Sequence, residues 1–137
     1  MKSYKLFALT AVMATSVAIT ACMGKPDFIQ KRETLKNSVV LINTFEVPKG
    51  QEANALASWQ ASRDFLKTQN GYISTTLHQN LNPDGKYHLV NVARWASVED
   101  FNKAISNMNQ TLSNNKVEGV VATPSLFKVI DSDVPFF

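Results

Sequence analysis

The segment Val39–Val47 constrains the fold most strongly, because nearly all of it suits a strand that is buried on both faces. Alternate strand residues point to opposite faces. One face carries Val39, Leu41 and Phe45, and the other carries Val40, Ile42 and Thr44. The chain must therefore cover both sides of this strand.

The residues after this strand alternate between helical and extended patterns. Gln51–Gln69 is rich in Ala, Leu, Gln and Lys, which predicts a helix closed by Asn70-Gly71. Tyr72–Leu81 and Lys86–Trp95 predict the two strands of a hairpin around the turn Asn82–Gly85. In the first of these strands, Tyr72 is expected on the same face as His78.

A second helix and a last strand complete the pattern. Ser97 is suited to cap a helix whose apolar stripe includes Phe101 and Ala104. The region Val120–Ile130 predicts a strand, and Pro124 within it indicates an edge, a bulge or an irregular entry.

The resulting order, β-α-β-β-α-β, predicts a ferredoxin-like α+β fold. Two helices can cover only one face of the four-stranded sheet. We expect a second copy of the chain to cover the other face, which gives a homodimer and a dimeric α+β barrel.

The N-terminus has the features of a lipoprotein signal. Two lysines precede an uncharged run that ends in Ile19-Thr20-Ala21-Cys22, which resembles a bacterial lipobox. This pattern predicts a signal peptide over 1–21, lipidation of Cys22 with anchoring to a membrane, and a tether over 22–36 before a domain over 37–137. Met23 follows the cysteine where an aspartate commonly signals retention in the inner membrane, which favours the periplasmic side of the outer membrane. The alternative is a buried N-terminal helix with a free thiol.

Charge and composition exclude several classes of protein. Removal of residues 1–21 leaves 12 basic and 11 acidic residues, so no basic stripe for nucleic acid remains. One cysteine excludes an internal disulfide, and one cysteine with two histidines excludes a self-contained structural zinc site.

From Val39 to about Asn107 the chain resembles the antibiotic biosynthesis monooxygenase family. The resemblance lies in Asn43–Gly50, in Gly71–Leu77 and in Val90–Phe101. It implies a domain that pairs as a dimeric α+β barrel. It also implies a relationship to cofactor-free quinol and anthrone oxygenases, to haem-degrading enzymes and to members with no established reaction.

Asn43 is the most informative candidate, because an amide inside an apolar strand must find a partner or cost a few kcal/mol. It shares a face with Phe45, and the strand register places it near Asn91. The two amides either bond to each other or hold an oxygen atom of a substrate or of O2. The family resemblance implies a place for Asn43 at the substrate cavity.

Aromatic residues are candidates for the cavity walls. Trp95 ends its strand just before a helix cap, where it either packs in the core or stacks on substrate. Phe45 and Trp59 are the other predicted walls, whereas Arg94 is expected on the opposite face of the sheet.

His78 and His88 are the candidate bases, because imidazole has the only suitable unperturbed pKa. They lie on the two strands of the predicted hairpin. If Leu81 pairs with Gly85 the histidines face each other, and if Leu81 pairs with Lys86 they point to opposite faces.

The haem-degrading branch of the family uses a tryptophan and a haem-ligating histidine on or after the second helix. The resemblance aligns these positions with Ala104 and, approximately, with Asn114. Asparagine is a poor iron ligand beside imidazole, so haem degradation by that route is not expected.

The sharpest functional prediction is oxygenation of a small aromatic, quinol-like compound by O2 without a metal or other cofactor. The protein would desolvate and position the substrate. A binding module that holds an apolar ligand without turnover is the alternative, and a purely structural envelope lipoprotein is a third hypothesis.

Overall fold

The computed structural model describes residues 29–30, 33, 35, 37–131 and 133. The predicted signal peptide, Cys22 and most of the predicted tether lie outside the described residues. Within the described part, no helix is long and apolar enough to cross a bilayer.

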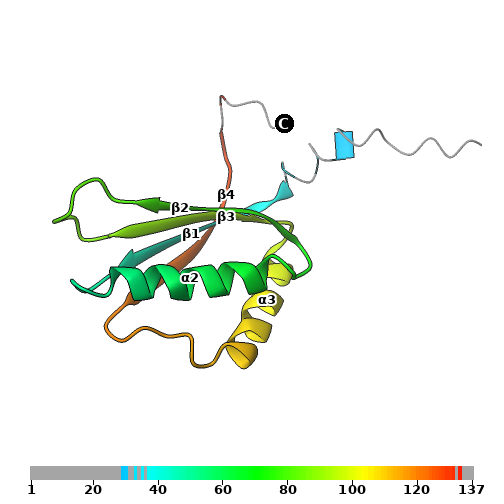
Figure 1. Cartoon of the computed structure of the whole chain (residues 1–137). Helices are drawn as coiled ribbons and strands as arrows, with labels where there is room; N and C mark the ends of the chain where they lie inside the picture. Colours follow the sequence, from blue (N-terminus) through cyan, green and yellow to red (C-terminus); the bar gives the residue numbers. More distant parts are fainter. Residues whose placement is uncertain (1–28, 31–32, 34, 36, 132, 134–137) are drawn as a thin grey trace, which may run out of the picture.

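The described chain has the predicted element order. The elements are β1 (Val39–Glu46), α2 (Glu52–Leu66), β2 (Tyr72–Gln79), β3 (Leu89–Trp95), α3 (Val98–Thr111) and β4 (Val121–Lys128). All paired strands are antiparallel, in the order β2-β3-β1-β4. Both helices lie on one side of the sheet (Figure 1). The ferredoxin-like α+β prediction is confirmed, and Pro124 lies on an edge strand, as its sequence indicated.

One end of the layer between sheet and helices is densely filled. Its buried cluster consists of Leu41, Ala93, Trp95, Phe101 and Ala104. The Trp95 ring is in edge contact with Tyr72, at 5.5 Å between centroids, and with Phe101, at 5.7 Å. Ser97 caps α3 as predicted, because its side chain accepts the N–H of Asp100 at 3.0 Å. This cap holds α3 against the end of β3.

The helix α2 covers the sheet less completely. Ala55 is its only buried residue, and Leu56 on the predicted apolar stripe is 42% exposed. The helix ends at Leu66, so the prediction of a cap at Asn70-Gly71 is wrong. The N–H groups of Thr68 and Gln69 turn back to carbonyl groups three residues earlier, which tightens the chain before Gly71. Gly71 instead leads into β2 with φ of +78°, close against the Asp100 side chain.

The hairpin differs from both predicted registers. His78 pairs with Val90, and a backbone hydrogen bond of 2.9 Å joins Asn80 to His88, so the two histidines are not opposite each other. The predicted turn is present, with the Gly85 N–H donating to Asn82 O at 3.1 Å. It lies inside a longer loop, because the Asn80 side chain donates to Tyr87 O at 2.7 Å and accepts the Asn82 N–H at 2.9 Å.

A bulge near the start of β2 also changes one predicted orientation. Tyr72 pairs with Trp95 while Ser74 pairs with Arg94, so one extra residue, Ile73, stands between them. Tyr72 therefore lies on the helix side with Trp95. Its predicted placement on the face of His78 is wrong.

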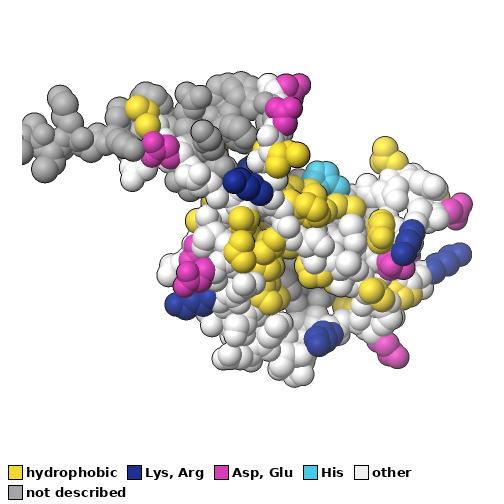
Figure 2. All heavy atoms as spheres, turned by 180° about the vertical axis from the view of Figure 1, so that it is seen from behind, with side chains coloured by type: hydrophobic (Ala, Val, Ile, Leu, Met, Phe, Trp, Pro, Cys, Tyr) yellow, Lys and Arg dark blue, Asp and Glu magenta, His cyan; other side chains and the backbone are white. Residues whose placement is uncertain are grey.

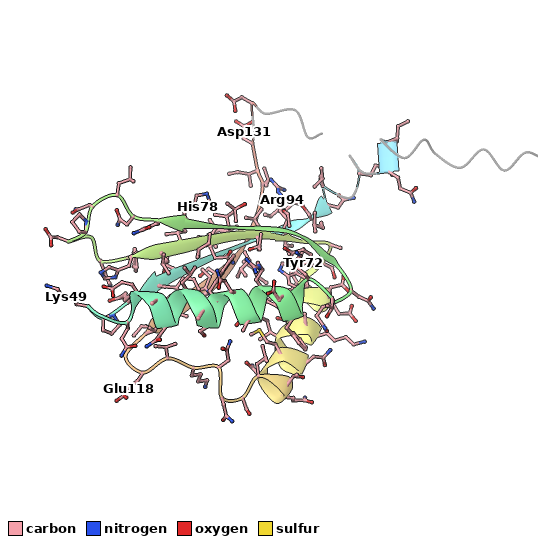
Figure 3. All side chains as sticks on the ribbon, in the orientation of Figure 1. Lys49, Tyr72, His78, Arg94, Glu118 and Asp131 are labelled. Atoms are coloured by element: carbon pink, nitrogen blue, oxygen red, sulfur yellow. The ribbon has the colours of Figure 1, made fainter. Side chains whose placement is uncertain are left out.

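The face of the sheet away from the helices is partly apolar and uncovered in the single chain. Val121 and Phe127 on β4 are 53% and 48% exposed, and Val40 and Val92 lie on the same face by register. From behind, hydrophobic side chains gather in the centre of the view, with charged groups mainly around them (Figure 2). His78 and Arg94 lie on this outer side, whereas Tyr72 lies toward the helices (Figure 3).

Candidate functional site

Asn43 and Asn91 lie directly opposite each other on neighbouring strands, as the sequence predicted. Asn43 is on β1 and Asn91 is on β3, and both are on the face that carries the buried core residues Leu41 and Ala93. The two amides therefore lie side by side beneath the helices. They form the next cross-strand pair on this face after the core pair Leu41 and Ala93.

The two amides differ in their hydrogen bonds. Asn91 is 7% exposed, and its Oδ1 accepts the hydroxyl of Thr75 at 2.5 Å. The Oδ1 of Asn43 is buried and has no hydrogen-bond partner within the described part of the chain. A buried unpaired acceptor costs about 1–3 kcal/mol. A bond between the two amides, one of the two alternatives that the sequence left open, is not formed among the described residues, and the acceptor of Asn43 stays unused.

The predicted aromatic walls occupy three different settings. Trp95 is 1% exposed within the filled core, although its Nε1 is buried without a partner among the described residues. Phe45 is half-buried and pairs with Leu89; this is the next cross-strand pair on the face of the amides, toward the end of β1. Trp59 is half-buried on α2, with the Arg63 guanidinium 5.3 Å from its ring centroid.

A cavity of about 490 Å³ opens beside the amides, between the start of α2 and the loop end of β2 and β3. Its lining residues are Val47, Glu52, Ala53, Leu56, Leu77, Gln79, Asn80, Asn82, Pro83, His88 and Leu89. Leu77 is the register partner of Asn91, and Leu89 is the partner of Phe45. Neither amide lines the cavity itself; Asn91 adjoins it through its cross-strand partner Leu77, and Asn43 is one strand further away. We call this space the inner pocket.

His88 is fixed at the mouth of the inner pocket. Its ring Nδ1 accepts the backbone N–H of Val47 at 3.0 Å, and the backbone N–H of His88 donates to Phe45 O at 2.8 Å. Because Nδ1 is the acceptor, the neutral ring carries its proton on Nε2. This arrangement leaves no free imidazole lone pair to act as a base toward the pocket.

His78 is exposed on the other face of the sheet, where its Nδ1 lies 3.2 Å from Val90 O. Of the two histidines, only His88 lines the inner pocket, and the two are not register partners. Among the described residues, no group of three or more His, Cys, Asp or Glu side chains is placed to hold a metal ion.

Two residues that the sequence did not single out contribute to the site. Thr75 orients the Asn91 amide, and Glu52 adds a carboxylate to the pocket mouth. The pKa of Glu52 is lowered, first because the carboxylate accepts the backbone N–H groups of Glu52 and Gly50. Thr75 shares the alternation of Leu77, so a search for polar residues on that face would have found it.

The positions aligned with the haem-degrading branch do not suit haem. Ala104 is 1% exposed within the core cluster. Asn114 is exposed in the loop after α3. Neither side chain is an iron ligand of the kind that the branch uses.

Comparison with known families and structures points to one group of proteins. The family described as antibiotic biosynthesis monooxygenase matches residues 38–107. A "putative monooxygenase" from Shewanella loihica is 42% identical, with a TM-score of 0.65 over 69% of this chain and 96% of that one. The comparison with curated proteins found no match.

Two more distant structures share the fold. SnoaB, a cofactor-independent oxygenase from Streptomyces nogalater, is 21% identical, with a TM-score of 0.59 over 70% of this chain and 96% of its own. The haem degrader MhuD from Mycobacterium tuberculosis is also 21% identical, with a TM-score of 0.55 over 69% and 97%. At these identities the likeness concerns the fold.

Proposed function

Because this chain belongs to the antibiotic biosynthesis monooxygenase family, we propose that it oxygenates a small aromatic, quinol-like compound with O2 and without a cofactor. The relative from Shewanella loihica supports a monooxygenase, and the shared fold of SnoaB supports chemistry that needs no cofactor.

The observation that carries the proposal is the unpaired Oδ1 of Asn43. It is buried on the helix face, opposite Asn91 and next to the inner pocket. A ligand hydroxyl at this point removes the cost of the unpaired acceptor. The Nδ2 of Asn91 is oriented by the bond from Thr75 to Oδ1, so it can donate to a second ligand oxygen or to reduced O2.

The reaction balances without an external reductant. The ionised aromatic ring gives an electron to O2, and recombination forms a carbon–oxygen bond. For a quinol, this bond makes a hydroperoxide at a ring carbon, and loss of water followed by tautomerisation gives a hydroxyquinone, with one oxygen atom in the product and the other in water. The substrate supplies all four electrons, so the protein needs only to bind, orient and exclude solvent.

The phenolic proton needs no histidine in this scheme. The Nδ1 lone pair of His88 is engaged by Val47, and His78 lies on the other face of the sheet. We propose that the substrate ionises according to its own acidity and that the rate follows the phenolate fraction with pH. The apolar wall formed by Leu56, Leu77 and Leu89 confines the ring.

Oxygen consumption tests this function directly. An oxygen electrode records uptake by the wild type and by Asn43→Ala with a panel of hydroquinones and related phenols. We expect uptake above the uncatalysed rate with some members, and a fall of about tenfold or more in Asn43→Ala if a buried hydrogen bond worth about 1–3 kcal/mol is lost. No uptake above background with any compound would overturn the proposal.

A non-catalytic binding protein is the second candidate, and the apolar wall of the inner pocket, with Leu56, Leu77 and Leu89, favours it. In that case the same panel shows saturable binding, for example by quenching of tryptophan fluorescence, without oxygen uptake. Loss of binding in Asn43→Ala together with zero turnover would select this function.

We propose further that the chain acts as a homodimer through the uncovered face of the sheet. The exposed Val121 and Phe127 support this pairing, because burial of apolar area drives association. Sedimentation of residues 37–131 without metal should show a dimer at micromolar concentration. A stable monomer would contradict the dimer.

The proposed location is the cell envelope, with Cys22 lipidated at the periplasmic side of the outer membrane. The lipobox-like sequence Ile19–Cys22 supports this. Cys22→Ser should leave an unlipidated precursor that retains residues 1–21. An identical mature mass with and without globomycin would contradict lipoprotein processing.

A further inference from the structure

The mouth of the inner pocket contains a hydrogen-bond donor that the oxygenation chemistry does not use. We propose that His88 recognises a neutral acceptor oxygen of the ligand, such as a carbonyl, through Nε2–H. This inference rests on the proposed ligand site and adds a second contact point, which selects the ligand by its hydrogen-bonding character.

The first argument is the fixed tautomer of His88. The Val47 N–H follows the last residue of β1, so it has no partner in the strand ladder and donates to Nδ1 instead, at 3.0 Å. Val47 is 3% exposed, so protonation of Nδ1 would leave a buried N–H without its acceptor. The remaining ring nitrogen, Nε2, is therefore a donor.

The second argument is that this donor is available. Nε2 makes no hydrogen bond within the part of the chain that the structure describes, and His88 lines the inner pocket. Its backbone N–H and carbonyl bond to Phe45 and Asn80, which holds the residue in place before any ligand arrives. A donor that is held in advance loses little entropy on binding.

The third argument is the charge beside the donor. Glu52 lines the same pocket as His88. A carboxylate at this point repels a ligand anion, but it leaves a neutral carbonyl unaffected. The walls around these two groups are apolar, with Leu56, Leu77 and Leu89 among them. The mouth therefore suits an uncharged, carbonyl-bearing end of an aromatic ligand.

The spacing agrees with a ligand that reaches both polar points. Asn91 and His88 are three residues apart, so their backbone positions are about 10 Å apart along an extended strand. One or two fused rings with oxygens at opposite ends can span this distance. The hydroxyl end would lie at the level of Asn91 and meet its cross-strand partner Asn43, and the carbonyl end would meet His88.

Binding of matched probes tests the role of His88 independently of turnover. The probes are 1-tetralone, its analogue tetralin without the oxygen, and the anion 1-naphthoate, measured on the purified protein by calorimetry. We expect the wild type to bind tetralone about five- to tenfold more tightly than tetralin, and His88→Phe to abolish this preference. His88→Gln, whose amide can still donate, should keep part of it. His78→Phe, on the other face, is the matched control and should bind like the wild type.

Glu52→Gln tests the selection by charge. It should strengthen the binding of naphthoate severalfold and leave tetralone unchanged. Unchanged naphthoate binding in this variant, or an unaltered tetralone preference in His88→Phe, would overturn the inference.

A spectroscopic measurement covers the case in which His88→Phe does not fold. Two-bond 1H–15N correlation spectra of the wild-type imidazoles distinguish the Nε2–H tautomer from the Nδ1–H tautomer and from the cation. We expect the Nε2–H pattern for His88 at pH 7, assigned by its absence in His88→Gln. Either of the other two patterns would contradict the proposal. A tetralone preference without oxygen uptake would support His88 recognition while refuting oxygenation.

Discussion

The two ends of the layer between sheet and helices are built from the same strands but are filled differently. At one end Trp95 is 1% exposed and packs against Tyr72 and Phe101, under α3. At the other end α2 covers the sheet incompletely, and the inner pocket lies beside Leu77 and Leu89. Asn43 and Asn91 lie between the two. A small α+β domain can therefore separate its tightly packed contacts from its pocket along a single sheet face.

The largest expected effect concerns the filled end. Trp95→Ala should lower the free energy of unfolding by about 3–5 kcal/mol, because it leaves a large cavity in a packed cluster. Leu56→Ala, at the hollow end, should cost about 1 kcal/mol or less, because Leu56 is already 42% exposed. Urea unfolding of both variants measures the contrast. Equal losses would mean that the two ends do not differ in packing.

An intermediate effect is expected where the two ends meet. Asn91→Leu should destabilise the fold by about 1–3 kcal/mol, because the Thr75 hydroxyl loses its acceptor. The double variant Thr75→Val/Asn91→Leu should recover most of this loss, since replacing both partners by apolar groups is nearly neutral. Thermal and urea unfolding compare the three proteins. A double variant that is less stable than Asn91→Leu would show that the bond is not the cause.

A smaller effect should appear at alkaline pH. The pKa of Tyr72 is raised, first by burial against the filled end, so the folded chain holds this proton more tightly than the unfolded chain. Stability should therefore fall as the pH rises above the unfolded pKa of about 10. Tyr72→Phe should reduce that fall, whereas Tyr87→Phe in the exposed hairpin loop serves as the control. Equal alkaline slopes in the wild type and Tyr72→Phe would contradict this assignment.

The sequence was sufficient for the element order and for the amide pair, because both depend on local periodicity. Once β1 and β3 were placed, strand alternation put Asn43 near Asn91, and the observed register agrees. The cap by Ser97 was equally predictable, because a serine at the start of a helix accepts a backbone N–H of the first turn, here that of Asp100.

The hairpin and the pocket were less predictable, because they depend on contacts between distant residues. The Asn80 side chain extends the loop, and His88 bonds to Val47, 41 residues earlier, so neither proposed register was correct. The bulge in β2 moved Tyr72 to the helix face against the simple alternation. Which histidine faces the pocket follows from these tertiary contacts and not from spacing.

We propose that Asn43 binds a ligand, whereas its neighbour Asn91 already accepts the hydrogen bond of Thr75. The most direct test is thermal unfolding of Asn43→Leu, with and without a saturating hydroquinone. We predict that the variant is as stable as the wild type or slightly more stable, because it removes an unpaired buried acceptor. The ligand-dependent rise in Tm should fall, consistent with a loss of about 1–3 kcal/mol of binding. A large loss of stability in Asn43→Leu that is rescued by Asn91→Leu would make Asn43 a structural residue and contradict the account.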